Sequence, residues 1–284
     1  MHVTILSART GWHTDQLCRA VTERGGKADV RPYESLVARL GEAQPTFALE
    51  ADVVLARIIP NGSLEQIIYR VDALHTLEDS GIRVMNSPRA IERSVDKFYA
   101  STILQRAGLA TPDTVVCECS EEALAAFRRF GDVVVKPLFG SMGLGMVRVT
   151  DEEMAFRVFR TIDLVRGVYY VQRTIDHAGS DVRVFVVGDR VLGAIERTAP
   201  PAGPQWRTNV SRGGIARAIA LPPALCAAAI EAARAVGADY AGVDLLPARD
   251  GTVYVLELNG IPGWQGFQQA TGIDVAGAIV DYVW

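Results

Sequence analysis

An acidic and an amide side chain stand two positions apart in TVYVLELNG, residues 252–260, a stretch that otherwise has the composition of a buried strand. Strand alternation puts Glu257 and Asn259 on one face together with Val255. Asp244 belongs to the preceding predicted strand, AGVDLL, and a turn through ARDG would place it opposite Val255 and diagonal to Glu257. Three oxygen ligands of this kind suit a hard cation such as Mg²⁺.

The alternative for a lone E-x-N pattern is an ordinary solvent-facing strand edge. The neighbours of Glu257 and Asn259 are apolar, however, and a buried carboxylate is costly unless a positive charge accompanies it. This context favours the metal site.

A second candidate site lies in VVVKPLFGSMGLGM, where Lys136 ends an apolar predicted strand and a glycine-rich stretch with Gly140, Gly143 and Gly145 follows. Glycines let backbone N–H groups approach phosphate oxygens closely, and the ammonium group supplies positive charge. The stretch lacks G-K-[ST] and is not a P-loop. It joins two strands, so it is also compatible with a turn that serves geometry alone. Lys97, near a predicted helix start, would by itself be taken as a surface charge.

Four arginines are spread over a predicted hairpin and the loop after it. Arg183 and Arg197 belong to the hairpin, whereas Arg207 and Arg212 belong to WRTNVSRGG. Guanidinium groups bind carboxylates and phosphates in a bidentate manner, so convergence of these side chains would create a site for one anion. Arg212 is equally compatible with a solvated loop.

Alternating strand and helix patterns must position these side chains. The first 90 residues are typical of an α/β lobe, and the turn after its first strand, SARTGWHT, lacks G-x-G-x-x-G, which argues against an oxidoreductase that binds a dinucleotide. We expect one helix over residues 94–108 and another over 120–131 with Ser120 as its N-cap. Hairpins that turn at 188–189 and at ARDG follow.

Composition excludes several classes of protein. With 284 residues, 49% hydrophobic, and a net charge of −4, the chain can bury a large core and has no basic field for nucleic acid. We expect no membrane span and no secretory signal, hence a cytoplasmic protein. No C-x-x-C pair occurs among the four cysteines, and the four histidines are scattered, which argues against a Cys or His metal site.

The order of these motifs resembles the ATP-grasp fold, and specifically the RimK-like α-L-glutamate (amino-acid) ligases. The resemblance is carried by D-K-F, V-K-P with the glycine loop, GSDVRVFVVGDRVLGAIER, WRTNVSRGG, AGVDLL and LELNGIPG, from Val95 to the C-terminus. It implies an α/β fold with an N-terminal Rossmann-like lobe at 1–92, a central ATP-grasp subdomain at 93–174 and a C-terminal one at 175–284.

The resemblance also implies a reaction and the residues that perform it. ATP would phosphorylate a carboxylate, an amine would attack the acyl phosphate, and an amide, ADP and phosphate would result, with two Mg²⁺ ions for which Mn²⁺ can substitute. The implied ATP-binding residues are Lys97, Lys136, Gly140, Ser141, Met142, Gly143, Gly145, Gln172, Arg173, Thr174 and Asp181. The implied contacts with the phosphoryl group, acyl phosphate or substrate are Arg207, Asn209, Arg183 and Arg197. The implied metal ligands are Asp244, Glu257 and Asn259.

The chain departs from the family pattern at two places. Arg173 and Thr174 stand where many relatives have an acidic residue and an aromatic at the adenine hinge, which puts side-chain recognition of the base in doubt. Trp264 and Gln265 follow the segment that replaces the usual N-x-S-P-G, and we expect these bulky residues to shape an acceptor pocket.

The leading hypothesis is a ligase that joins L-glutamate or another amino acid to a carboxylate of a small-molecule cofactor precursor or a peptide. The alternative is a non-catalytic MgATP-binding regulatory module, against which the joint presence of all three metal ligands counts. The resemblance suggests a homodimer or homotetramer.

Overall fold

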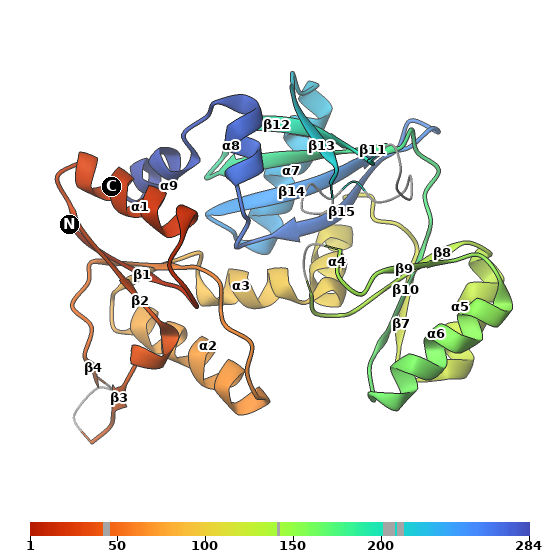
Figure 1. The fold of residues 1–284 in the computed structure, drawn as a ribbon, viewed down its shortest axis with the longest axis horizontal. Coiled ribbons are helices and arrows are strands. Elements are labelled where there is room, and N and C mark those ends of the chain that lie inside the picture. The colour runs from red at the N-terminus through yellow and green to blue at the C-terminus, as the bar shows by residue number, and fades with distance from the viewer. Residues whose placement is uncertain (42–45, 141–142, 201–207, 209–212) are drawn as a thin grey trace.

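The computed structural model describes the chain except residues 42–45, 141–142, 201–207 and 209–212 (Figure 1). Its N-terminal lobe contains a parallel sheet in the order β2-β1-β5-β6. The strands of this sheet are β1 (His2–Leu6), β2 (Lys27–Arg31), β5 (Val53–Ala56) and β6 (Arg83–Met85). The other elements of the lobe are α1 (Trp12–Glu23), η1 (Tyr33–Ser35), β3 (Ala38–Arg39), β4 (Thr46–Phe47), α2 (Leu64–Asp79) and α3 (Pro88–Val95). Helices on both faces of the parallel sheet make this the predicted Rossmann-like lobe (Figure 1).

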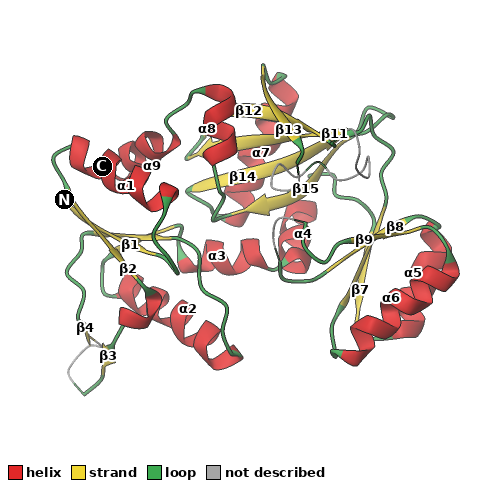
Figure 2. Ribbon diagram, viewed as in Figure 1, coloured by secondary structure: helices red, strands yellow, loops and turns green. Residues whose placement is uncertain are grey.

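The second sheet is antiparallel and has the order β7-β10-β8-β9. Its strands are β7 (Thr114–Cys117), β8 (Val133–Lys136), β9 (Val147–Val149) and β10 (Tyr169–Arg173). Helices α5 (Ser120–Phe130) and α6 (Glu152–Leu164) cover one face and bury a core that includes Phe127, Val135 and Phe159 (Figure 2). Strand alternation places Lys136, Tyr170 and Gln172 on the opposite face.

The third sheet is antiparallel, in the order β13-β12-β11-β14-β15. Its strands are β11 (Ser180–Val187), β12 (Arg190–Thr198), β13 (Ile215–Ile219), β14 (Tyr240–Pro247) and β15 (Val253–Asn259). Helices α4 (Lys97–Arg106) and α7 (Pro223–Val236) pack on one face, whereas α8 (Gln265–Thr271) and α9 (Val275–Val283) lie over the other. Both hairpins predicted from the sequence are present. The chain ends lie close together because α9 packs beside α1 (Figure 1).

Two helix predictions were wrong in detail. The single helix expected over 94–108 is divided at Asp96, whose side chain accepts a hydrogen bond from the Tyr99 N–H and starts α4. The preceding residues form α3, which Ser87 caps. The N-cap of α5 is Cys119 rather than Ser120.

One buried side chain joins the N-terminal lobe to the third sheet. Asn86, fully buried after β6, accepts a hydrogen bond from the Tyr240 N–H (3.0 Å) and donates to the Tyr240 carbonyl (2.8 Å) and to that of Gly260. The amide thus fixes the lobe against the start of β14 and the end of β15, where the predicted metal ligands lie.

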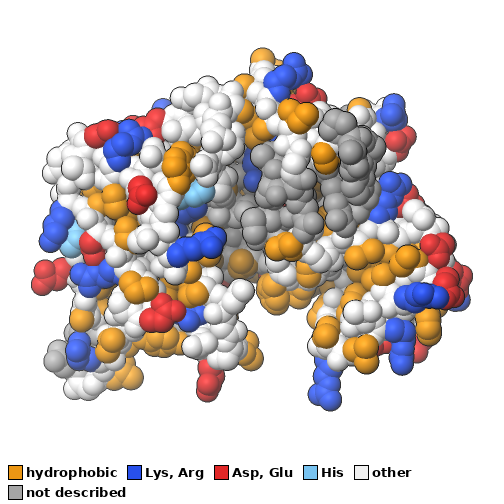
Figure 3. All heavy atoms as spheres, in the orientation of Figure 1, with side chains coloured by type: hydrophobic (Ala, Val, Ile, Leu, Met, Phe, Trp, Pro, Cys, Tyr) orange, Lys and Arg blue, Asp and Glu red, His pale blue; other side chains and the backbone are white. Residues whose placement is uncertain are grey.

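The sequence analysis expected no membrane-spanning helix and no basic field for nucleic acid. In the described part of the chain, no helix has the length and apolar character needed to cross a bilayer. Basic and acidic side chains are interspersed over the face shown in Figure 3, with no large patch of one sign.

Candidate functional site

A β-bulge places Asp244 directly opposite Glu257. Leu245 pairs with Val255, while Asp244 pairs with Glu257, so Leu256 is an extra residue in β15. The sequence-based placement of Asp244 opposite Val255 was therefore wrong. The bulge also reverses the alternation, because Val255 and Leu258 both pack in the core under α7, leaving Glu257 on the opposite face.

Asp244 is held by two arginines. Arg183 forms a bidentate pair with it, through Nε to Oδ1 and Nη2 to Oδ2, both at 2.7 Å. Arg197 lies 3.0 Å from the same Oδ2. Burial would raise the pKa of Asp244, but the two guanidinium groups outweigh it and hold the pKa at about 2. Among the described residues Oδ1 accepts only one of these bonds, which leaves a lone pair that could bind a cation.

The same network extends to Asp181, one of the implied ATP-binding residues. Arg197 binds Asp181 through two hydrogen bonds of 2.6 and 2.7 Å, and the Thr208 hydroxyl donates to it at 2.6 Å. Arg183 and Arg197 thus bind two carboxylates of the chain itself, and the predicted site of four arginines for one anion stays a prediction. Thr208 was missed by the sequence analysis, although it stands between the predicted Arg207 and Asn209.

Glu257 and the glycine loop meet at Lys97, the first residue of α4. Its Nζ donates to the Gly140 carbonyl (2.7 Å) and lies 3.9 Å from Glu257 Oε1. The side chain is only 12% exposed, so Lys97 is not the surface charge that its sequence context alone suggests. Gly143 and Gly145, with φ of 67° and 74°, have the left-handed backbone that glycine permits.

Lys136 ends β8 and belongs to a series of hydrogen-bonded polar side chains. Its Nζ donates to Gln172 Oε1 (2.6 Å), and the Gln172 amide donates to Thr114 Oγ1 (3.0 Å). Burial lowers the pKa of Lys136 to about 8, and the nearby Glu257 opposes this effect. Tyr170, also missed, extends this series to a hydroxyl contact with Ser101 (2.9 Å).

The third predicted metal ligand, Asn259, is paired with Gly242 two residues beyond the Asp244–Glu257 pair. In the described part of the chain its Oδ1 accepts one hydrogen bond, from the Ile261 N–H (2.9 Å), which leaves a lone pair. Two facing carboxylates and a nearby amide oxygen fit a hard cation that retains several waters. Within the described ranges no cluster of three or more His, Cys, Asp or Glu side chains could hold a metal ion, so the candidate ligands there are two carboxylates and one amide.

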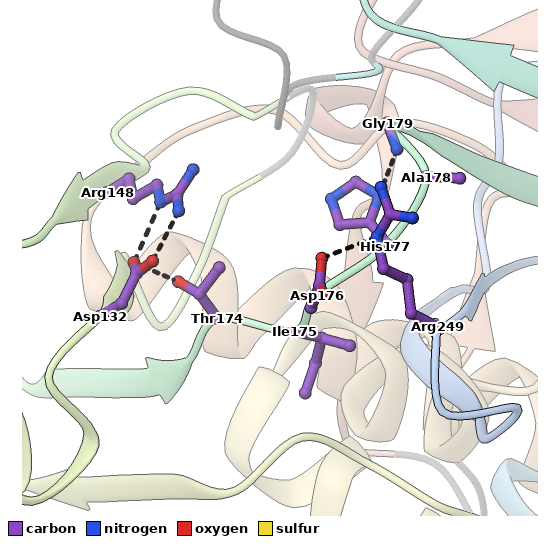
Figure 4. Close-up of a pocket in the computed structure, with 9 residues that line it drawn as sticks. All are labelled: Asp132, Arg148, Thr174, Ile175, Asp176, His177, Ala178, Gly179 and Arg249. Atoms are coloured by element: carbon purple, nitrogen blue, oxygen red, sulfur yellow. Dashed lines mark hydrogen bonds and ion pairs between the residues drawn. The ribbon is translucent and has the colours of Figure 1, made fainter.

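A cavity of about 80 Å³ lies between the second and third sheets. It is lined by the predicted nucleotide-binding residues Lys136, Gln172, Arg173, Thr174 and Asp181, and by Thr208, Leu246 and Leu256. Ligand pockets usually measure about 300–1,000 Å³, so this volume accommodates only part of a nucleotide. A wider cavity of about 530 Å³ shares Thr174, Ile175 and His177 with it. The ion pairs Asp132–Arg148 and Asp176–Arg249 line opposite sides of this wider cavity (Figure 4).

The two hinge residues that depart from the family pattern are bound by neighbours. Strand alternation puts Arg173 on the face of Tyr169 and Val171, away from Gln172, and its Nε lies 3.0 Å from Asp113 Oδ2. The Thr174 hydroxyl donates to Asp132 (2.8 Å). Both side chains thus contact acids of the chain, and their predicted place at the adenine hinge stays a prediction.

The acceptor-pocket prediction for Trp264 was wrong. Its side chain is fully buried, with Phe267 and Val275 in the core between the N-terminal lobe and the third sheet. Gln265 is exposed. Ser141, Met142, Arg207, Asn209 and Arg212 lie outside the described residues, and their predicted roles stay predictions.

Comparison with known proteins gives the same family that the sequence motifs suggested. Residues 94–283 match the family model of the RimK-like ATP-grasp domain. The tetrahydromethanopterin:alpha-L-glutamate ligase of Methanosarcina acetivorans is 34% identical, over 96% of this chain and 95% of its own length.

Two solved structures share the fold. A RimK domain ATP-grasp protein from Sphaerobacter thermophilus is 24% identical with a TM-score of 0.78, covering 99% of each chain. The ATP-grasp ligase PsnB, solved with a minimal precursor, Mg and ADP, is 22% identical with a TM-score of 0.75, covering 98% of this chain and 96% of its own. The predicted ATP-grasp fold is thereby confirmed.

Proposed function

Because the chain belongs to the RimK-like ATP-grasp family of ligases, we propose that it uses MgATP to join the α-amino group of an amino acid to a carboxylate of a second molecule. L-Glutamate is the amino acid we favour, and the acceptor is a small-molecule cofactor precursor or a peptide. The observation that carries the proposal is the facing pair Asp244–Glu257 beside Lys97, which links the metal ligands to the glycine loop.

The described residues suit the binding of a polyphosphate. Lys97 and Lys136 place two ammonium groups near Glu257, and the approach of a phosphate would favour the charged form of Lys136, which burial disfavours. Mg²⁺ held by Asp244, Glu257 and Asn259 would neutralise phosphate charge. Catalysis in this class consists chiefly of positioning and charge neutralisation, and no nucleophile of the protein is required.

The finer parts of the proposal rest on the family relationship. They include two metal ions, for which Mn²⁺ can substitute, and the subdomains 1–92, 93–174 and 175–284. They also include a homodimer or homotetramer and a cytoplasmic location. The preference for glutamate draws support from the ligase of Methanosarcina acetivorans, which is named for tetrahydromethanopterin and glutamate.

The test is ADP release with Mg²⁺, L-glutamate and a panel of carboxylate acceptors, with products weighed by mass spectrometry. Glu257→Gln removes one predicted metal ligand, whereas Glu231→Gln changes an acid on α7 that pairs with Arg234 and serves as the control. We expect an acceptor to gain the mass of one glutamate residue with the wild type and with Glu231→Gln only. If MgATP binds tightly and no member of a broad panel is consumed, the regulatory-module alternative is favoured instead.

A further inference from the structure

A buried guanidinium group without a carboxylate partner lies at the junction of the N-terminal lobe and the third sheet. Arg57 is 3% exposed, and in the part of the chain that the structure describes no acidic side chain lies within ion-pair distance of it. Its polar partners are neutral: Nη1 donates to the Tyr240 hydroxyl (3.2 Å) and Nη2 to the Pro262 carbonyl (3.0 Å). The group also lies 4.6 Å from the centre of the Trp264 ring. A buried positive charge with neutral partners creates a positive potential around it.

This charge stands where an α/β lobe ordinarily binds ligands. Arg57 directly follows β5, and the segments after β1 and β5 are tied together by the hydrogen bond from Ala8 N–H to the Ile58 carbonyl (2.9 Å). Ligands of parallel sheets bind at the carboxyl ends of the strands, which is this edge. Exposed residues at the edge include Arg9 and Ile58.

The same edge adjoins the predicted metal site. Segment 260–264 directly follows Asn259, and Arg57 binds it at Pro262. Pro262 and Arg183 both lie beside Gly242, 3.1 and 3.7 Å from where a Cβ of that residue would stand. Arg183 in turn holds Asp244. A molecule in front of segment 260–264 would therefore lie close to the reacting groups.

His13 presents a fixed hydrogen-bond donor at this place. Its Nε2 accepts from the Trp264 N–H (3.1 Å), so Nε2 is unprotonated and the proton of the neutral ring is on Nδ1. Burial, followed by the charge of Arg57, lowers the pKa of His13 to about 4, which keeps the ring neutral near neutral pH. Nδ1 has no partner among the residues that the structure describes, and the side chain is partly exposed beside the exposed Gly263.

We propose that His13 is a specificity-determining residue for the acceptor and that its Nδ1–H donates a hydrogen bond to an anionic group, a carboxylate, of a small acceptor molecule. Arg57 is a positioning residue that supplies positive potential and holds segment 260–264. The inference rests on the proposed ligase function and assigns it an acceptor site between the SARTGWHT turn and segment 260–264.

NMR of the full chain with ¹⁵N-labelled histidine rings reports the tautomer of His13 and the binding of a ligand at its Nδ1. Two matched probes differ in charge: N-acetyl-L-glutamate carries two carboxylates, and N-acetyl-L-glutaminamide is its neutral counterpart. His13→Gln assigns the His13 signals, and His75, which pairs with Glu92 on the far side of the lobe, is the internal control. We expect the Nδ1–H tautomer, and a saturable shift of the His13 signals with the charged probe alone.

Variants of Arg57 test whether its charge contributes to binding of N-acetyl-L-glutamate or whether the residue has only a structural role. Arg57→Met is expected to weaken binding of N-acetyl-L-glutamate about tenfold, the size of one lost charged interaction, whereas Arg57→Lys, which keeps the charge, is expected to retain most of it. If Arg57→Met does not fold, the comparison of wild type with Arg57→Lys and the probe pair still decides. An Nε2–H tautomer, equal shifts with both probes, or no shift up to millimolar concentrations overturns the inference.

Thermal stabilisation by MgATP, measured in parallel, keeps the two proposals apart. Stabilisation by MgATP without a His13 response refutes only the acceptor site. A His13 response to the charged probe in a protein that MgATP does not stabilise supports the site and contradicts the ligase function.

Discussion

Replacing Lys136 by methionine should stabilise the protein while it abolishes nucleotide binding. Lys136 is 9% exposed, and burial lowers the pKa of its ammonium group from 10.5 to about 8. This lowering corresponds to about 3 kcal/mol of penalty for the charged form. Methionine removes the penalty and leaves Gln172 Oε1 without its donor, at a cost of about 1–3 kcal/mol. We therefore expect Lys136→Met to be more stable by about 1 kcal/mol near neutral pH.

The sign of the pH dependence follows from the lowered pKa. Above pH 10.5 the amine is neutral in the folded and unfolded chains, so burial carries no charge penalty. As the pH falls from 10.5 towards 8, the unfolded chain binds the proton first and the wild type loses stability. Below about pH 8 the penalty is complete. The advantage of the variant should thus be greatest near neutral pH and vanish, or reverse, near pH 10.

Urea unfolding at neutral and at alkaline pH, with and without MgATP, measures both effects. Lys27→Met, at an exposed lysine that starts β2, is the matched control and should change neither. MgATP should raise the midpoint for the wild type and for the control but not for Lys136→Met. A Lys136→Met variant that is less stable than the wild type at neutral pH, or whose gain in stability does not shrink as the pH rises, would refute the interpretation that burial destabilises the charged form of Lys136.

Three further predictions concern the junction and the metal ligands. Asn86→Ala removes three hydrogen bonds at Tyr240 and Gly260, leaves a buried N–H unpaired, and should lower the free energy of unfolding by about 2–4 kcal/mol in urea titrations. Asp244→Asn leaves Arg183 without a carboxylate and leaves the buried Arg197 with Asp181 alone, and it should cost about 3–5 kcal/mol in the same assay. Glu257→Gln removes an acid that is 38% exposed and 3.9 Å from its nearest cation, so its stability should change by less than about 1 kcal/mol while the Mg²⁺ concentration needed for ADP release rises. Equal stability losses for the last two variants would contradict the distinction drawn between them.

The sequence predicted those features that depend on neighbouring residues. The hairpins at 188–189 and ARDG and the glycine loop between two strands rest on local turn chemistry and alternation, and all are present. The bulge at Leu256 was missed because regular alternation fits the sequence equally well, and only pairing with β14 reveals the extra residue. The break at Asp96 was missed because its N-capping role competes with a helical pattern that runs through it.

The charged residues of the site were identified, but their partners were not. Arg183 and Asp244 are separated by 61 positions in the sequence, and their pairing depends on β11 lying beside β14. A list of candidate ligands cannot show which of them bind one another. Lys97 illustrates the converse, since its sequence context suggests solvent and the fold places it between a carbonyl and a carboxylate.

The charge balance of the site explains why a metal ion suits it. Two arginines and two aspartates form a network that is neutral as a whole, so it fixes geometry and adds no attraction for an anion. Among the described residues of the site, Lys97, Lys136 and Glu257 remain, and their net charge is +1 when both amines are protonated. A triphosphate carries several negative charges, which one net positive charge in a desolvated site cannot balance. Mg²⁺ at Asp244 and Glu257 would supply positive charge on the side where these carboxylates otherwise repel phosphate, so metal and nucleotide should each raise the affinity for the other.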